Sequence, residues 1–121
     1  MWHSLKKHLT NIHFTRIESR TINGIPDLFG IHKGVSFWCE LKSDYVSYPK
    51  LSKWQVSWIN TYVMRGGVMI ICNRALLQRA LKLYRIQSVV EDPKLLIADR
   101  EFPMHGAWDK VEEAWLELIH K

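Results

Sequence analysis

A continuous apolar run at residues 68–72, Val-Met-Ile-Ile-Cys, constrains the fold more than any other segment. It has the length of a β-strand, and apolar side chains on both faces are typical of a strand covered on both sides. Residues 52–64 have the pattern of a helix, with a serine N-cap and two glycines after its end. Residues 35–42 are rich in strand-forming residues. Strand, helix and strand in this order predict a crossover connection between two parallel strands.

Two turn signals divide the chain before the crossover helix into three short strands. Residues 14–18 alternate in polarity, and an Asn-Gly pair precedes the apolar segment 25–31. A Lys-Gly pair supplies the second turn, before residues 35–42. We therefore expect an antiparallel three-stranded meander that joins the parallel pair in one mixed sheet.

Helical spacing of apolar residues predicts three further helices, at residues 2–13, 75–83 and 107–120. The apolar stripe of the last helix either covers the sheet or pairs with a second subunit. The expected fold is a single α/β domain over residues 1–121, with its core at residues 14–73 and a helical part at residues 74–121.

The charge of the chain points to an anionic partner. The sequence has 17 Lys and Arg against 12 Asp and Glu, a formal net charge of +5. Residues 1–60 hold 8 basic and 4 acidic side chains, so most of the excess lies there. Nucleic acid is the commonest partner of a basic protein. With 47% hydrophobic residues the chain can build a core, which excludes an intrinsically disordered protein.

The sequence also bears on cellular location. No apolar run approaches the roughly 20 residues that a membrane-spanning helix needs. Residues 1–7 lack the apolar stretch of a secretory signal. We therefore expect a cytoplasmic protein, in the host cytoplasm if it is viral, with no membrane partner. Cys39 and Cys72 each lie in an apolar run, which favours two buried thiols over a disulfide or a zinc site.

Glu40 and Lys42 form the centre of a candidate site on the strand predicted at residues 35–42. Residues two apart on a strand share a face, so these side chains lie side by side. The carboxylate can bind a hard divalent cation, and the ammonium group can orient water or stabilise phosphate charge. Asp27, across the hairpin, would supply a second ligand and Glu18 a third. The alternative, commoner for this spacing alone, is a solvated strand face with a salt bridge.

The sequence Pro26-Asp27, followed after twelve residues by Glu40-Leu41-Lys42, resembles the signature of the PD-(D/E)XK nuclease superfamily. Its surroundings are similar to the compact VRR-NUC branch, whose stand-alone members are small phage and bacterial proteins. The similarity covers residues 14–73 and also includes Arg16-Ile17-Glu18, Gly24-Ile25, Leu51-Ser52, Gln55 and Trp58. The resemblance implies a restriction-endonuclease-like core, with the mixed sheet flanked by helices.

The resemblance also implies a role for each matching residue. Asp27, Glu40 and the backbone carbonyl of Leu41 would bind Mg²⁺, with Mn²⁺ able to substitute. Lys42 would be the catalytic lysine. Glu18 matches an upstream acidic residue that contributes to the site directly or through water.

Two residues at the start of the helix predicted at 52–64 complete the candidate site. Gln55 would reach the site from the first turn, near the positive end of the helix dipole. There it and Ser52 could position water or phosphate. Ser52 could equally serve only as the N-cap.

Contacts to DNA are expected from a set of basic and hydroxyl side chains, namely Lys6, Lys7, Arg16, Arg20, Ser52 and Lys53. Arg16 shares the predicted strand face of Glu18 and is the best single candidate. Trp54, Trp58 and Tyr62 recur every four residues, which predicts core packing rather than a platform for stacking on bases.

The implied activity is hydrolysis of DNA phosphodiester bonds by a magnesium-dependent, structure-selective endonuclease that uses no small-molecule cofactor. A four-way (Holliday) junction is symmetric and needs two matched cuts, which a homodimer supplies. The first expectation is therefore a junction-resolving homodimer. The alternative enzyme is a nickase or a nuclease that processes flaps and ends. The alternative of another class is a catalytically inactive DNA-binding module.

Overall fold

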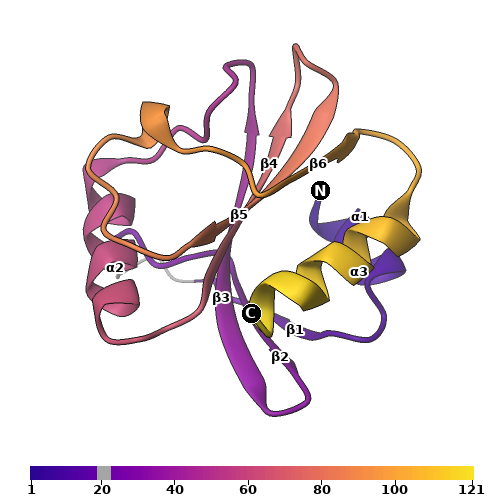
Figure 1. Cartoon of the computed structure of the whole chain (residues 1–121), viewed down its shortest axis with the longest axis horizontal. Helices are drawn as coiled ribbons and strands as arrows, with labels where there is room; N and C mark the ends of the chain where they lie inside the picture. Colours follow the sequence, from indigo (N-terminus) through magenta and orange to yellow (C-terminus); the bar gives the residue numbers. More distant parts are fainter. Residues whose placement is uncertain (19–22) are drawn as a thin grey trace.

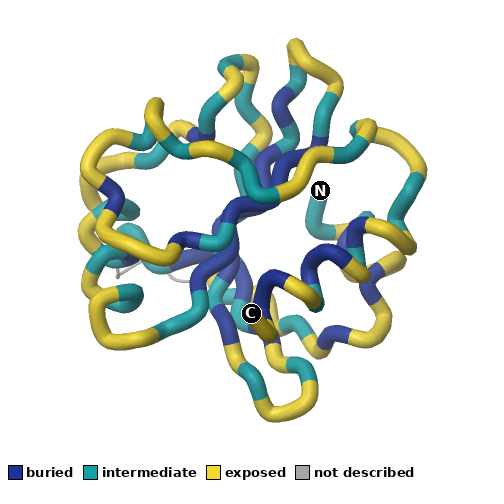
Figure 2. The backbone as a smooth tube through the Cα atoms, viewed as in Figure 1, coloured by how far each residue is buried: buried dark blue, intermediate teal, exposed yellow. Residues whose placement is uncertain are grey.

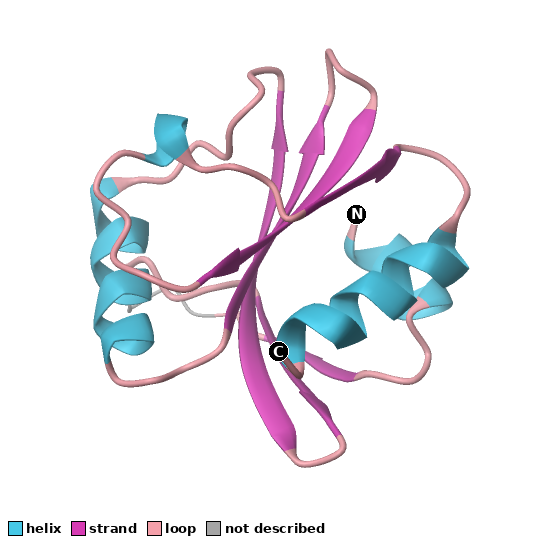
Figure 3. Ribbon diagram, in the orientation of Figure 1, coloured by secondary structure: helices cyan, strands magenta, loops and turns pink. Residues whose placement is uncertain are grey.

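A six-stranded sheet runs through the molecule, with helices against both of its faces (Figure 1; Figure 3). The structure is a computed structural model and describes residues 1–18 and 23–121. The strands lie side by side in sequence order: β1 (His13–Arg16), β2 (Leu28–His32), β3 (Val35–Asp44), β4 (Met69–Ala75), β5 (Ala80–Ile86) and β6 (Arg100–Pro103). The helices are α1 (Trp2–His8), α2 (Lys53–Met64), α3 (Trp108–Ile119) and a short 3-10 helix, η1 (Pro93–Leu95).

The strand–helix–strand unit is present as predicted. β3 and β4 are parallel, with Glu40 beside Ile71 and Lys42 beside Asn73, and α2 connects them. The other neighbouring strands are antiparallel, including the predicted meander of β1, β2 and β3. Residues 69–72 are fully buried, because β4 lies inside the sheet and is covered on both faces.

Two apolar cores lie on opposite faces of the sheet. Leu5 of α1 and Trp115 of α3 pack with Phe37 of β3 in one core. Ile59 of α2 packs with Tyr84 of β5 in the other. Figure 2 shows the buried residues following the strands and the sheet-facing side of α3. The apolar stripe of α3 therefore covers the sheet, which decides between the two alternatives that the sequence left open.

The prediction of a helix at residues 75–83 is wrong. This segment forms a turn and then β5, which pairs antiparallel with β4 along its whole length. Alternate side chains of β5 enter opposite cores, Leu81 and Leu83 on the α3 side and Tyr84 on the α2 side. This pairing overrides the helix-forming composition of the segment. Because β5 and β6 both lie in it, residues 74–121 are not the helical part that the sequence predicted.

The first helix is shorter than predicted, because α1 ends at His8 rather than at residue 13. Asn11 leaves the helical path and binds α3 instead: its backbone N–H and its Nδ2 donate to the Glu112 carboxylate at 3.1 and 2.7 Å. These bonds tie the N-terminal segment to α3. Among the described residues, no helix has the length and apolar character needed to cross a membrane.

Candidate active site

Asp27 lies immediately before β2, which begins at Leu28 rather than at residue 25 as predicted. The backbone N–H of Ile17 donates to the Asp27 carbonyl oxygen at 2.7 Å, which continues the β1–β2 pairing beyond both strands. Oδ2 of Asp27 accepts a hydrogen bond from the backbone N–H of Leu41 at 2.9 Å. These bonds to the segments on either side fix the position of the Asp27 carboxylate.

The central strand β3 presents Glu40 and Lys42 toward α2, as the predicted alternation required. Both side chains contact Gln55 of α2. Cys39 points to the opposite core, where burial raises the pKa of its thiol well above the usual value. The thiol is therefore unreactive, and the chemistry of this strand lies on its α2 side.

Gln55 joins the acid to the lysine. Its Nε2 donates to Oε2 of Glu40 at 2.6 Å, and its Oε1 accepts from Nζ of Lys42 at 3.1 Å. The same Oε1 accepts from the backbone N–H of Ser52 at 2.9 Å, while Oγ of Ser52 accepts from the backbone N–H of Gln55 at 3.2 Å. This capping box begins α2 and holds the Gln55 amide toward β3.

Glu40 is buried, and the Lys42 ammonium group offsets only part of the effect of burial on its carboxyl group. The residue is 3% exposed, and Nζ of Lys42 lies 3.7 Å from its Oε2. Its Oε1 has no hydrogen-bond partner among the described residues. Burial, followed by the negative charge of Asp27, raises the pKa of Glu40 to about 8, although the Lys42 ammonium group opposes this shift. Without a further cation, Glu40 is mostly protonated at neutral pH.

These residues fit a hard divalent cation. Asp27 and Glu40 repel each other electrostatically, and the unpartnered Oε1 of Glu40 is a buried acceptor. The Leu41 carbonyl would be the third oxygen donor; Leu41 lies two residues beyond Cys39, the last residue of β3 that pairs with β2. Among the described residues no three Asp, Glu, His or Cys side chains gather closely enough to hold a metal. Water and substrate oxygens would therefore complete the coordination, as is usual for Mg²⁺.

Comparison with known proteins bears on the fold. No protein-family profile and no curated protein sequence matches the chain. Among solved structures, it is similar to Hjc of Archaeoglobus fulgidus, a Holliday junction resolvase from an archaeal hyperthermophile. The TM-score is 0.55 and the sequence identity 13%, over 92% of each chain. The chain has a restriction-endonuclease-like fold. Membership of the VRR-NUC branch stays a prediction.

The structure does not bring Glu18 to the candidate site of Asp27 and Glu40. β1 ends at Arg16, so Glu18 lies beyond the strand on which the sequence placed it. Its side chain is 79% exposed, and its Oε1 lies 3.9 Å from Nε of Arg16. Arg16 and Glu18 thus form a surface ion pair, although Glu18 does not share the strand with Arg16 as predicted. Arg20 lies outside the described residues.

The sheet separates the other basic residues into two groups. Lys6 and Lys7 lie on α1, across the sheet from α2 (Figure 1). Lys53 is the first residue of α2, close to Gln55 in the sequence, and its Nζ lies 5.0 Å from the centroid of the Trp54 ring. Only Lys53 of these three is on the same face of the sheet as Glu40 and Lys42.

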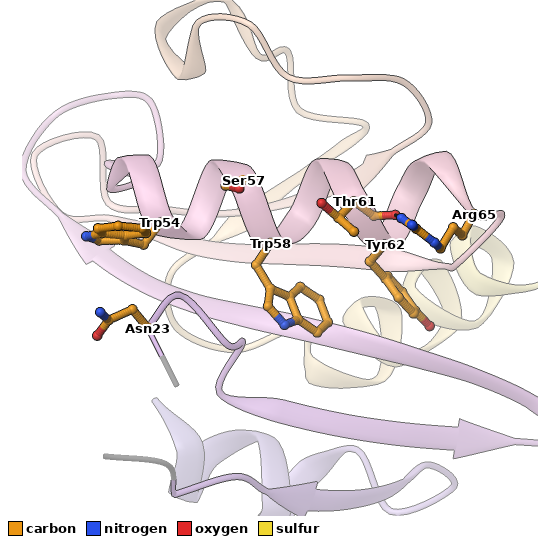
Figure 4. A pocket seen from close by; sticks show the side chains of 7 residues that line it. All are labelled: Asn23, Trp54, Ser57, Trp58, Thr61, Tyr62 and Arg65. Carbon is orange, nitrogen blue, oxygen red and sulfur yellow. Dashed lines mark hydrogen bonds between the residues drawn. The ribbon is translucent and has the colours of Figure 1, made fainter. Parts of the chain in front are cut away.

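A groove along α2 was not predicted from the sequence. The prediction of core packing fails for Trp54, whose surface is 53% exposed. Trp58 and Tyr62 are partly buried and stack with ring centroids 5.3 Å apart. The three aromatic residues line a groove of about 410 Å³ together with Asn23 and Arg65 (Figure 4). Their spacing revealed a common helix face, but exposure depends on what the fold leaves uncovered.

A buried amide beside Lys42 was also missed. Asn73 directly follows the apolar run 68–72 and is fully buried in β4, paired with Lys42 in the parallel register. The sequence showed only a polar residue at the end of an apolar strand. The strand register, which the sequence does not give, places this residue next to Lys42.

Proposed function

We propose that the protein is a magnesium-dependent, structure-selective DNA endonuclease that resolves four-way junctions as a homodimer. The observation that carries the proposal is the meeting of Asp27, Glu40 and Lys42, linked through Leu41 and Gln55, in a restriction-endonuclease-like fold. The similarity to a Holliday junction resolvase supports the choice of substrate. The net charge of +5 supports an anionic partner.

Each residue has a chemical role in this proposal. Asp27, Glu40 and the Leu41 carbonyl would hold the cation, which lowers the pKa of water and stabilises charge on the phosphate. Lys42, which Gln55 holds near Glu40, donates hydrogen bonds to the attacking water or to the phosphate. The water oxygen bonds to phosphorus and gives up a proton to solvent, while the bond from phosphorus to the 3′ oxygen breaks and that oxygen takes up a proton from solvent. The products are 5′-phosphate and 3′-hydroxyl ends.

The test is incubation of the purified protein with four-way junction, flap, nicked and linear DNA, in Mg²⁺, Mn²⁺ or chelator. We expect metal-dependent, paired symmetric cuts in the junction. Asp27→Asn and Lys42→Ala should each reduce cleavage about 100-fold or more, because each removes a group that acts on the transition state. Lys42→Ala should still bind DNA and metal.

Several results would count against this proposal. Metal-independent cleavage, or full activity in both variants, would contradict the mechanism. Unpaired single cuts would instead indicate a nickase or a flap and end-processing nuclease. Binding of DNA without cleavage under any metal condition would indicate an inactive DNA-binding module. A monomer on junction DNA in sedimentation experiments would contradict paired cutting.

A further inference from the structure

An aromatic wall along α2 begins next to the candidate active site. Trp54 directly precedes Gln55, which contacts both Glu40 and Lys42. Trp58 and Tyr62 continue the wall along the helix, with their rings stacked at an interplanar angle of 28° (Figure 4). The wall therefore begins one residue from a side chain of the candidate site, on a neighbouring face of the same helix.

The groove suits a flat and anionic ligand. Arg65 lies at one end, Ser57 and Thr61 add hydroxyl groups to the lining, and none of the described residues that line it is acidic. Its volume of about 410 Å³ falls within the roughly 300–1,000 Å³ of small-ligand sites. Aromatic faces stack on nucleobases of any sequence. Bases inside a duplex already stack on their neighbours, so only an unpaired base can offer a free face.

We propose that the groove binds unpaired nucleotides of the DNA strand that continues from the scissile phosphate. A base would stack on the α2 aromatic wall, and a later phosphate of the same strand would lie near Arg65, about 15 Å along the helix from Gln55. The inference rests on the proposed nuclease function and narrows its substrate class to DNA with unpaired bases next to the cut. A fully paired duplex would not fill the groove.

The experiment compares binding of two four-way junctions in Ca²⁺ or chelator, where cleavage is suppressed. One junction is fully paired, and the other has two unpaired thymines at the branch point. Wild type should bind the second at least tenfold more tightly, and Trp54→Ala should reduce this preference to less than threefold. Met64→Ala is the matched control: it is 72% exposed on the same helix but does not line the groove, so the preference should remain.

Equal binding of both junctions by wild type, or an unchanged preference in Trp54→Ala, would overturn the inference while leaving DNA binding intact. Dissociation of a dimer by Trp54→Ala, seen by sedimentation without DNA, would also overturn it, because the groove would then be occupied by a second copy. Absence of binding to either DNA would instead contradict the proposed function.

A second and independent inference concerns Asn73, which lies on β4 beside Lys42 of β3. Residues paired across neighbouring strands lie about 4.8 Å apart and share a face, so the two side chains are neighbours. Asn73 is 0% exposed, and neither of its amide atoms has a hydrogen-bond partner among the described residues. An unpartnered buried amide destabilises a fold, so an apolar residue would be preferred here if Asn73 had only a packing role.

Lys42 can donate a hydrogen bond to the amide oxygen of Asn73. An ammonium group has three donors, and Oε1 of Gln55, at 3.1 Å, is its hydrogen-bond acceptor in the described structure. We propose that Asn73 is a positioning residue whose Oδ1 accepts from Nζ of Lys42, directly or through one water, and directs the ammonium group at the phosphate. The other polar group near the amide is the Tyr84 hydroxyl. Burial raises the pKa of Tyr84, and the Asn73 amide, which is close enough to interact with the hydroxyl group but makes no well-aligned hydrogen bond to it, opposes that shift.

Asn73→Leu tests this role, which also rests on the proposed nuclease function. We expect kcat to fall tenfold or more with KM changed less than twofold, and an unfolding midpoint equal to or above that of wild type. Asn73→Ser, which keeps an acceptor, should recover part of kcat. Asn60→Leu is the structural control: Asn60 bonds both the N–H and the carbonyl of Val90, at 2.7 and 2.9 Å, so its loss should lower stability but leave kcat unchanged.

Tyr84→Phe distinguishes an effect of Asn73 on Lys42 from an effect of Asn73 on Tyr84. If Asn73 acts on Lys42, this variant should keep wild-type kcat. Unchanged kcat in Asn73→Leu, or a loss of kcat shared equally with Tyr84→Phe, would overturn the inference. Absence of cleavage by wild type would contradict the proposed function instead.

Discussion

Glu40 is the buried carboxylate to which we assign the proposed cation. It accepts one hydrogen bond from Gln55 through Oε2, while its Oε1 is buried without a partner in the described part of the chain. Its raised pKa means that the folded protein holds a proton there more tightly than the unfolded chain does. A proton and the proposed divalent cation would therefore compete for the same carboxylate.

The raised pKa of Glu40 predicts an unusual dependence of the stability of the metal-free protein on pH. Because folding raises the pKa of Glu40 from 4.5 to about 8, the group stabilises the metal-free fold fully below about pH 4.5 and loses this contribution as the pH rises toward 8. In chelator, wild type should lose on the order of a few kcal/mol of unfolding free energy over this range relative to Glu40→Gln. Urea melts at several pH values measure the difference. Parallel pH profiles for the two proteins would contradict the raised pKa.

Binding of Mg²⁺ should restore the stability that the metal-free protein loses as the pH rises. At about pH 8, Mg²⁺ should raise the unfolding midpoint of wild type, by an amount equivalent to about 2.7 kcal/mol at a concentration 100 times its dissociation constant. Asp27→Asn and Glu40→Gln should show little or no response, because each lacks one carboxylate ligand. Glu113→Gln, at an exposed position on α3, is the control and should respond like wild type. A similar rise in all four proteins would mean that Mg²⁺ does not bind at this site.

At the scale of elements, the site depends on a close backbone contact between the turn before β2 and the start of α2. Gly24 has a φ of +81°, and a Cβ atom there would lie 2.2 Å from the carbonyl oxygen of Trp54. The turn leads to Asp27, and Trp54 is followed by Gln55. This contact therefore sets the distance between the segments that carry the carboxylate and the amide.

Gly24→Ala should disturb both the fold and the site. Gly34→Ala is a matched control, because Gly34 also has a φ of +81° but an added Cβ would meet nothing within 4 Å. The control should lose about 1–2 kcal/mol of stability from backbone strain alone and keep its cleavage rate. Gly24→Ala should lose clearly more and cleave more slowly, because Trp54 and α2 must move. Equal losses of stability, measured by denaturant unfolding, would show that the close contact is not restrictive.

At the scale of the whole molecule, the sheet divides the basic residues that the sequence grouped together. Lys53 lies on the α2 face with Glu40 and Lys42, whereas Lys6 and Lys7 lie on the α1 face (Figure 1). DNA that reaches the candidate site approaches the α2 face. The contribution of each lysine to binding should follow this division.

Salt-dependent binding tests the division. Lys53→Gln should weaken binding to junction DNA and reduce the slope of log affinity against log salt by about 0.9, the value for one phosphate contact. The double variant Lys6→Gln and Lys7→Gln should bind within about twofold of wild type. If instead the double variant loses the larger part of the slope, DNA must also contact the α1 face, for example across a dimer.

Local patterns in the sequence determined much of the fold. Strand–helix–strand order predicted the parallel pair β3 and β4, and alternation placed Glu40 and Lys42 on one face. The serine N-cap and the position of Gln55 predicted the start of α2 and its contact with the site. These features were predictable because each depends on residues close together in the chain.

Only the tertiary structure decided the features that depend on distant partners. Residues 80–86 have helix-forming composition, but pairing with β4 makes them a strand. Trp54 shares a helix face with Trp58, yet it is exposed because no element covers it in the described structure. Asn73 became a neighbour of Lys42 through the strand register, and Glu18 was left on the surface. Sequence periodicity records which face of an element is apolar, whereas register and coverage are set by residues far away in the chain.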